Sequence, residues 1–162
     1  MYKVLFDSDA LIKIAKAEFI VATVECFDVL ITEDVYNETV EEGKKGFYAD
    51  ADKIEELVKQ GRINVLKVDY YKKGKKPKQS FGIGETSVFQ AYKKGRLVVT
   101  DDLSFALYLE KKSIKYLSSA HILLMLLKKH KLTKDEAYHC LEKMKPFIRR
   151  QIYEIIKKDI GG

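Results

Sequence analysis

Acidic residues stand directly after two apolar segments that have the composition of buried strands. Asp7 follows the segment 2–6, and Asp101 and Asp102 follow the segment 97–100. In open parallel α/β sheets, binding sites form outside the carboxyl ends of the strands. We therefore expect Asp7 and Asp102 to lie at one edge of a sheet, where their carboxylates could act on a common ligand.

Two glutamates could join this edge. Glu38 falls in a predicted helix after the strand 29–31, and Glu85 opens a predicted helix, 85–94, after the sequence Gly-Ile-Gly. Carboxylates gathered in one pocket repel one another, and a divalent cation removes that repulsion. Mg²⁺ prefers oxygen ligands and can orient and activate a water molecule beside a phosphate. The four acids therefore predict metal-assisted hydrolysis of a phosphodiester, with their carboxylates within metal-bridging distance.

Each of these acids also has a purely structural interpretation. Asp7 could end a strand and cap the helix that follows, and Asp9 fits that N-cap role better. Glu38 could point to solvent from the middle of its helix. Glu85 lies in a first helical turn, where the helix dipole favours a negative charge in any case. The two aspartates after the segment 97–100 could likewise be a cap and its neighbour.

The composition bounds the class of protein. The chain has 162 residues, 46% of them apolar, which suits one folded domain and leaves little room for a second. Its net charge of +6 favours a polyanionic partner. Cys26 and Cys140 lack the spacing of a metal site, and we expect both to be reduced thiols. The longest apolar run, 120–127, is too short to cross a bilayer, so we expect a cytoplasmic protein with no membrane partner.

The spacing of apolar residues predicts alternating strands and helices, and hence a parallel sheet with helices on both faces. Thr32 is expected to cap a helix that stops at Gly43, and Thr133 with Glu136 has the pattern of a capping box. The strands expected are 2–6, 29–31, 63–68 and 97–100, and the helices are 10–25, 32–43, 50–60, 85–94 and 102–112.

The last part of the chain is predicted to be helical. Ser118 or Ser119 is expected to start a helix, Pro146 to mark a break, and an apolar stripe to follow on the final helix. The residues of that stripe are Ile148, Ile152, Ile155 and Ile156. We expect a single domain over 1–162, with a core of about 1–127 and a helical C-terminal extension over 128–162.

The segment 72–78, KKGKKPK, has a strongly basic, low-complexity sequence. Lysine contacts phosphate without reading sequence, and Tyr70 and Tyr71 beside the segment could stack on bases. A solvated surface loop is at least as good an interpretation. The residues that we expect to contact RNA are Lys72, Lys73, Lys75, Lys76 and Lys78.

In their order and spacing, these segments resemble the PIN-domain family, and especially its VapC-like ribonucleases. The opening VLFDSDALIKI is similar to the family's first strand, acid and helix, and it places that acid at Asp7. The next three motifs are matched by ITEDVYNETVEEG, GIGETSVFQAYKKG and LVVTDDLSFALYL, which place their acids at Glu38, Glu85 and Asp102. The resemblance covers residues 1–127, and it rests on the four motifs together because none is specific alone.

The resemblance implies a three-layer α/β/α sandwich on a mainly parallel central sheet. It also implies an endoribonuclease that depends on Mg²⁺ or Mn²⁺, and members of this kind are commonly toxins neutralised by a small antitoxin protein and are frequently homodimers. Many members carry Asn, Ser or Thr at Asp9, which could add a ligand or have no role, and Ser119 could support the site or simply cap a helix. The catalytic residues implied are Asp7, Glu38, Glu85 and Asp102, and the metal ligands expected are Asp7, Glu85, Asp102, Asp101 and Asp9.

Two other functions stay open on the sequence. FDSDAL contains the Asp-x-Asp of haloacid-dehalogenase-type phosphatases, in which Asp7 would be the nucleophile and Asp9 the acid and base. Leu11 stands where that family usually has Thr or Val, and the lysine that its chemistry needs cannot be placed. The third interpretation is a non-catalytic PIN-like scaffold that binds RNA or protein, against which the presence of all four acids argues.

Overall fold

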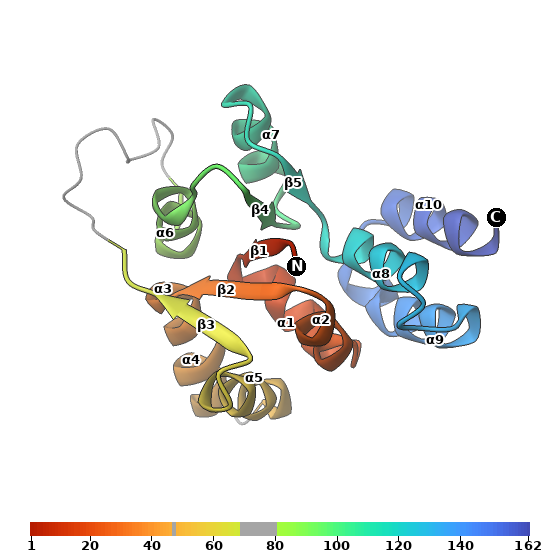
Figure 1. Cartoon of the computed structure of the whole chain (residues 1–162), viewed down its shortest axis with the longest axis horizontal. Coiled ribbons are helices and arrows are strands. Elements are labelled where there is room, and N and C mark those ends of the chain that lie inside the picture. The colour runs from red at the N-terminus through yellow and green to blue at the C-terminus, as the bar shows by residue number, and fades with distance from the viewer. Residues whose placement is uncertain (47, 69–80) are drawn as a thin grey trace.

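The computed structural model describes residues 1–46, 48–68 and 81–162 (Figure 1). The basic segment 72–78, which is predicted to contact RNA, therefore lies outside the described residues. Five strands form one all-parallel sheet in the order β3-β2-β1-β4-β5. The strands are β1 (Lys3–Phe6), β2 (Asp28–Thr32), β3 (Ile63–Leu66), β4 (Arg96–Val99) and β5 (Tyr116–Leu117).

Helices cover both faces of this sheet (Figure 1). On one face lie α1 (Ser8–Lys16), α2 (Ile20–Cys26) and α5 (Ala49–Lys59), whereas α6 (Ile83–Ala91) and α7 (Leu103–Lys111) lie on the other. The helices change face because the chain moves outward in opposite directions from β1 and from β4, and crossovers between parallel strands of one sheet are right-handed as a rule. The predicted α/β/α sandwich with a parallel central sheet is confirmed.

The central strands carry the core. Val4, Leu5 and Phe6 on β1 and Val98 and Val99 on β4 have no exposed surface. A strand covered by helices on both faces presents apolar side chains in both directions, and this is why its sequence is a continuous apolar run. The same packing fixes the register of β1 against β4, and with it the position of the residues that follow both strands.

Three helices follow the sheet: α8 (Ser119–Lys128), α9 (Lys134–Met144) and α10 (Arg150–Gly161). α8 packs against α1 and α2, α9 packs against α1, and α10 packs on α8 and α9. The predicted capping box at the start of α9 is confirmed, because the Thr133 hydroxyl and the Glu136 carboxylate each accept a backbone N–H. This group of helices forms the right-hand side of the molecule in Figure 1.

The predicted apolar stripe at the C-terminus is confirmed for Ile148, Ile152 and Ile156, which pack on the core, but not for Ile155. The break at Pro146 is confirmed by a short 3₁₀ turn, Lys145–Phe147. On α10, Ile155 faces solvent and is 51% exposed. The buried residues of α10 are Tyr153, Ile156 and Ile160, which follow one another at the spacing of one helical face.

The single helix predicted over 10–25 is wrong, because the chain turns between α1 and α2. Glu18 adopts a φ of 65°, and the Phe19 N–H donates to the Ile14 carbonyl in the reversal. The turn allows Phe19 and Ile20 both to be buried in the core. Local spacing could not reveal this, since a glutamate is not a residue that favours a left-handed backbone.

The helix after β2 does not stop at Gly43 as predicted. Thr32 caps it as expected, and α3 (Glu33–Tyr36) then passes into a π-helical turn, Asn37–Glu41, and on into α4 (Glu42–Lys45). A π turn shifts the side chains that follow it around the helix axis, and such turns are rare and concentrate at functional sites. Glu38 lies within this one.

The remaining boundaries differ less. β3 ends at Leu66 instead of Val68, and α6 ends at Ala91 instead of Lys94. The edge strand β5 has only two residues, and no periodicity can be read from so short a segment. Among the described residues, no helix combines the length and the apolar character needed to cross a membrane.

Candidate active site

The sheet has its topological switch point between β1 and β4, because the chain runs from β1 toward β2 and from β4 toward β5. Ligand sites of open α/β sheets form at the carboxyl ends of the strands at this point. Asp7 follows β1 and Asp101 follows β4 by two residues, so the two predicted acidic segments meet there. We call Asp7, Glu38, Glu85, Asp101 and Asp102 together the acidic edge.

Asp7 is the most buried acid of this edge, with 2% of its surface exposed. It is the N-cap of α1, since one carboxylate oxygen accepts the Ala10 N–H at 2.9 Å and the other accepts a short hydrogen bond from the Thr100 hydroxyl. Burial raises the pKa of Asp7 to about 7, the bonds from Thr100 and Ala10 oppose this rise, and the nearby charges of Asp101 and Asp9 add to it.

The prediction that Asp9 fits the N-cap role better than Asp7 is wrong. Asp9 lies in the first turn of α1 with a side chain 64% exposed, and its carboxylate forms an ion pair with Lys13 at 2.8 Å. Asp7 takes the cap because its extended backbone directs its carboxylate back over the helix start. Capping and burial therefore coincide in one residue, and the structural and functional interpretations of Asp7 do not exclude each other.

The Thr100 hydroxyl connects Asp7 to the residue two positions further along. It donates to Asp7 and accepts the Asp102 N–H at 3.1 Å. Asp102 is the N-cap of α7, where one carboxylate oxygen accepts the Phe105 N–H at 2.7 Å. The other oxygen stays available, because Asp102 is exposed and its carboxylate forms no ion pair within the described chain.

Asp101 is held far more firmly than Asp102. Its carboxylate accepts two bonds from Ser119, from the backbone N–H at 2.8 Å and from the hydroxyl at 2.5 Å, and it lies 3.3 Å from the Lys13 ammonium. Ser118 is the residue that caps α8. Ser119 is fully buried and holds Asp101 instead, so the structure separates the two roles between which the sequence could not decide.

Glu38 and Glu85 form the second part of the acidic edge. A Cβ atom at Gly84 would lie 2.5 Å from one Glu38 carboxylate oxygen and 3.1 Å from the other. Glycine is therefore required at 84 for the Glu38 carboxylate to lie against the start of α6, one residue before Glu85. Burial raises the pKa of Glu38, the Ser8 hydroxyl opposes this, and the negative charge of Glu85 adds to it.

A buried hydroxyl pair joins the two helical segments that carry these glutamates. Thr32 and Ser87 have no exposed surface, and their hydroxyl oxygens are 2.6 Å apart. Thr32 caps α3, which leads to Glu38, and Ser87 lies on α6 two residues after Glu85. The Ser87 hydroxyl also lies 2.7 Å from the Gly84 carbonyl, to which it can donate. Both helix starts are thereby joined across the end of β2.

The structure brings all the predicted acids to one sheet edge, in two groups instead of around one point. Asp7, Asp101 and Asp102 are linked through Thr100 and the end of β4, and Glu38 and Glu85 meet at Gly84. In the described part of the chain, no three His, Cys, Asp or Glu side chains are arranged to hold a metal ion. The expected metal-bridging distance among all four acids is thus not seen.

The residues present nevertheless fit a divalent cation in their chemistry. The donors are carboxylates, as Mg²⁺ and Mn²⁺ prefer, and they accumulate like charge at the ends of two strands. Ser8 lies beside Asp7 in the chain and close enough to Glu38 to lower its pKa. Its buried hydroxyl forms no hydrogen bond of regular geometry with any described residue. A buried hydroxyl close to Glu38 that lacks a hydrogen bond of regular geometry leaves room for a further polar partner at this edge.

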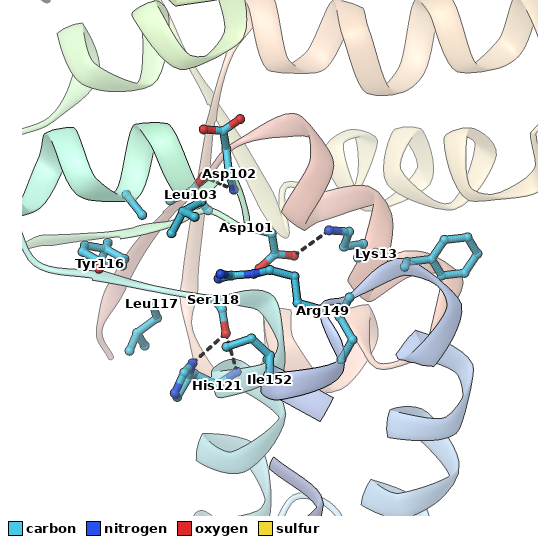
Figure 2. Close-up of a pocket in the computed structure, with 14 residues that line it drawn as sticks. Lys13, Asp101, Asp102, Leu103, Tyr116, Leu117, Ser118, His121, Arg149 and Ile152 are labelled. Atoms are coloured by element: carbon cyan, nitrogen blue, oxygen red, sulfur yellow. Dashed lines mark hydrogen bonds and ion pairs between the residues drawn. The ribbon is translucent and has the colours of Figure 1, made fainter. Parts of the chain in front are cut away.

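A cleft of about 420 Å³ opens beside Asp101 and Asp102, between the ends of β4 and β5 and the start of α10 (Figure 2). The polar side chains around it include Lys13, His121 and Arg149. Sequence reasoning found no role for these residues, because they come from three helices whose packing is not readable from local spacing. The residues that line this cleft, called the Arg149 cleft below, are Lys13, Thr100, Asp101, Asp102, Leu103, Ala106, Tyr116, Leu117, Ser118, His121, Phe147, Ile148, Arg149 and Ile152.

The bond from Ser119 to Asp101 gives a first testable expectation. Replacing Ser119 with Ala removes the hydroxyl donor, so the Asp101 carboxylate keeps only the backbone N–H and Lys13. Residues that hydrogen-bond to a metal ligand typically contribute about 10- to 100-fold to metal affinity or activity. We expect a loss of cleavage rate in that range and a loss of about 1–2 kcal/mol in the free energy of unfolding.

A second variant separates the effect of Ser119 on the position of Asp101 from its effect on the stability of the fold. Thr133→Ala removes the cap of α9, which should lower the free energy of unfolding by about 1 kcal/mol without touching the acidic edge. Urea unfolding and a metal-dependent cleavage assay are run on both variants. Equal cleavage by the two variants would show that Ser119 contributes to stability only.

The fold and the site together define a doubly covered parallel α/β protein that gathers carboxylates at the switch point of its sheet. The sequence model of a PIN-domain family, DUF3368, matches residues 3–160. The chain therefore belongs to the PIN-domain family. No curated protein matches the chain.

Membership confirms the resemblance to PIN domains and indicates nuclease activity on a nucleic acid, for which PIN domains typically use divalent metals. The match extends through α9 and almost to the end of α10, beyond the part of the chain that the motifs cover. The family does not decide which nucleic acid is cut. It argues against the haloacid-dehalogenase alternative, as does the exposed, lysine-paired position of Asp9.

Proposed function

We propose that the protein is a metal-dependent endoribonuclease whose acidic edge binds Mg²⁺ or Mn²⁺ and hydrolyses RNA phosphodiesters. The observation that carries the proposal is the burial of Asp7 at the switch point with a pKa raised to about 7, close to the negative charges of Asp101 and Asp9. A protein does not gain stability by placing these charges together, so their arrangement is best explained by a cation that they bind.

In this proposal Asp7 and Asp102, which are linked through Thr100, would hold the metal, and Glu85 would join them from the second group of acids. Asp101 would support the site from its fixed position on Ser119. When bound, the metal would orient a water molecule and neutralise charge that develops on the phosphate. Glu38 is the acid placed to accept a proton from the attacking water, since its raised pKa brings it nearer to the working pH of a general base. Asp9 is the outermost of the predicted ligands, and we assign it the smallest part.

The proposed reaction is a hydrolysis in which water is the nucleophile. Water attacks phosphorus, the P–O bond to the 3′ oxygen breaks, and a proton goes to that oxygen from solvent. The products are a 5′ phosphate and a 3′ hydroxyl. Because no 2′ hydroxyl takes part in the bond changes, the preference for RNA would come from binding.

The finer features of the family resemblance are also proposals. We propose RNA contacts by the five lysines of the segment 72–78, a small antitoxin protein as a partner, a homodimer, a cytoplasmic location and a single PIN unit over 1–162. The excess of positive charge supports a polyanionic substrate. A scaffold that binds RNA without cutting it is the alternative that the next experiment addresses.

Single-stranded RNA, single-stranded DNA and a generic phosphomonoester are incubated with the protein, with and without Mn²⁺, and the product ends are mapped. We expect cleavage of RNA only with metal, 5′ phosphate ends, and no turnover of the monoester. Asp102→Asn should reduce cleavage by about 100-fold or more, since it removes one charged ligand. Glu110→Gln, an exposed change of the same kind on α7, should have no effect.

Cyclic 2′,3′ phosphate ends would contradict the proposed attack by water. Turnover of the monoester would favour the phosphatase, and RNA binding without any cleavage would favour the scaffold.

A further inference from the structure

The Arg149 cleft contains a cation that nothing in the described chain neutralises. The Arg149 side chain is exposed, and it forms no ion pair or hydrogen bond with any residue that the structure describes. Figure 2 shows it extending over the cleft toward Asp101 and Ser118. Lys13, the other cation at this cleft, is already paired with Asp9 and Asp101. Arg149 is therefore the group free to receive an anion.

The cleft offers a second polar group, His121, which is beside Ser118 (Figure 2). The Ser118 hydroxyl accepts the His121 backbone N–H and lies 2.6 Å from Nδ1 of the same residue. Burial lowers the pKa of His121, against the opposing charges of Asp159 and Asp101, so the ring is neutral at pH 7. A Ser118 hydroxyl that donates to Nδ1 leaves the proton of the neutral ring on Nε2, from which His121 can donate to an anion.

The rest of the cleft is apolar. Leu117 closes β5, and Ile148 and Ile152 approach from the start of α10, with the Tyr116 ring at the rim. A wall of aliphatic side chains beside a free arginine fits a molecule with a flat apolar part and a negative group. A nucleotide has both, and bases pack on apolar and aromatic surfaces without regard to sequence.

We propose that the Arg149 cleft holds one nucleotide of the substrate beside the cleaved bond, with its phosphate on Arg149 and His121 and its base against Leu117 and Ile152. This deepens the proposed function and rests on it, since the cleft borders Asp101 and Asp102. The nucleotide held here would fix the register of the strand relative to the acidic edge. Only an unpaired nucleotide has its base free to enter.

Binding is measured with adenosine 5′-monophosphate, which contains no phosphodiester and is therefore not cut. Adenosine and inorganic phosphate are the two partial probes, all in the presence of Mg²⁺. We expect the nucleotide to bind more tightly than either part. Arg149→Gln should weaken nucleotide binding about tenfold, the effect of losing a charge-assisted hydrogen bond, and Ile152→Ser should weaken both nucleotide and adenosine.

Arg150→Gln is the matched control, because Arg150 is the next residue on α10, is also exposed, and does not line the cleft. Melting temperatures of all variants are compared first, so that a loss of binding is not a loss of fold. Equal weakening by Arg149→Gln and Arg150→Gln would overturn the subsite, as would the absence of nucleotide binding to the wild type. If the wild type binds no nucleotide, the apolar wall of the cleft would instead suit a protein partner.

The two proposals fail separately. If the wild type cuts RNA but nucleotide binding does not depend on Arg149, the subsite is wrong and the ribonuclease stands. If nucleotide binding depends on Arg149 but no RNA is cut, the ribonuclease is wrong and the protein binds nucleotides at this cleft.

Discussion

Replacing Asp7 with Asn should abolish metal-dependent cleavage and at the same time make the metal-free protein more stable at pH 8. Asparagine can still cap α1, but it supplies no negative charge to a cation. A metal contributes several kcal/mol to stabilisation of such a transition state, so we expect a rate loss of about 10³-fold, equivalent to roughly 4 kcal/mol. Asp52→Asn, the same change at an exposed position of α5, should retain full activity.

The gain in stability follows from the raised pKa of Asp7. Burial raises this pKa to about 7, whereas an aspartate in the unfolded chain has a pKa of about 3.9. Between these two values the folded state binds the proton more strongly, so the wild type loses stability as the pH rises from about 4 to about 7. Well above pH 7 the penalty is complete, and it amounts to roughly 4 kcal/mol.

Urea unfolding of wild type and Asp7→Asn at pH 5 and pH 8, without metal, measures this penalty. The variant should be the more stable at both pH values, and its advantage should be larger at pH 8 by about 2–3 kcal/mol. Adding Mn²⁺ should stabilise the wild type and leave the variant nearly unchanged. If the variant is less stable than the wild type at pH 8, the ionised Asp7 carboxylate does not destabilise the folded protein.

Gly84→Ala should remove activity while leaving the fold as stable as before. The added Cβ would lie 2.5 Å from a Glu38 carboxylate oxygen, and that oxygen is the far end of a side chain that can turn away. Alanine within α6 is favoured over glycine by up to about 1 kcal/mol, which offsets the local crowding. The Glu38 carboxylate, however, is displaced from its position near Glu85, and we expect the rate of RNA cleavage to fall by about 100-fold or more.

A double variant tests whether Glu38 is the cause. Glu38→Asp shortens the side chain by one methylene group and alone should lower activity. In the Gly84→Ala background it withdraws the carboxylate from the new methyl group, so the double variant should be more active than Gly84→Ala. Purely additive losses in cleavage, measured alongside melting temperatures, would mean that Gly84 acts through something other than Glu38.

The parallel sheet with helices on both faces and two of the helix caps could be predicted from the sequence because they depend on local patterns, whereas the strand order and the edge strand β5 could not. A buried parallel strand is a continuous apolar run, and the segment before Asp7 has that form. The hydroxyl at Thr32 and the capping box at Thr133 act within one turn of their own helices. Each of these features depends only on residues that are close in the sequence, and the structure confirms all three.

Features that depend on packing between distant segments could not be predicted. The turn at Glu18 exists because Phe19 is buried in the core, and no local preference of glutamate indicates it. The π turn that carries Glu38 is likewise invisible to the spacing of apolar residues. The approach of Glu38 to Gly84 joins residues from two helices, and it gives the second glycine of Gly-Ile-Gly-Glu a physical reason.

The candidate site shows the same division. Its acids were found by their position after strands, but their hydrogen bonds distinguish residues that the sequence treats alike. Asp101 is held by Ser119 from a helix that begins 18 residues later, whereas Asp102 caps the helix that it precedes. Arg149 lies still further along the chain and reaches the same edge only through the packing of α10 on α8.

The measurement that tests the central claim most directly is the binding of Mn²⁺ to the protein in the absence of RNA, by calorimetry or by electron paramagnetic resonance. We predict that the wild type binds Mn²⁺, that Mg²⁺ competes for the same site, and that Asp7→Asn binds it at least tenfold more weakly while Asp52→Asn is unaffected. If the wild type binds no Mn²⁺ at millimolar concentration, or if Asp7→Asn binds it equally well, the acidic edge is not a metal site and the proposed mechanism is wrong.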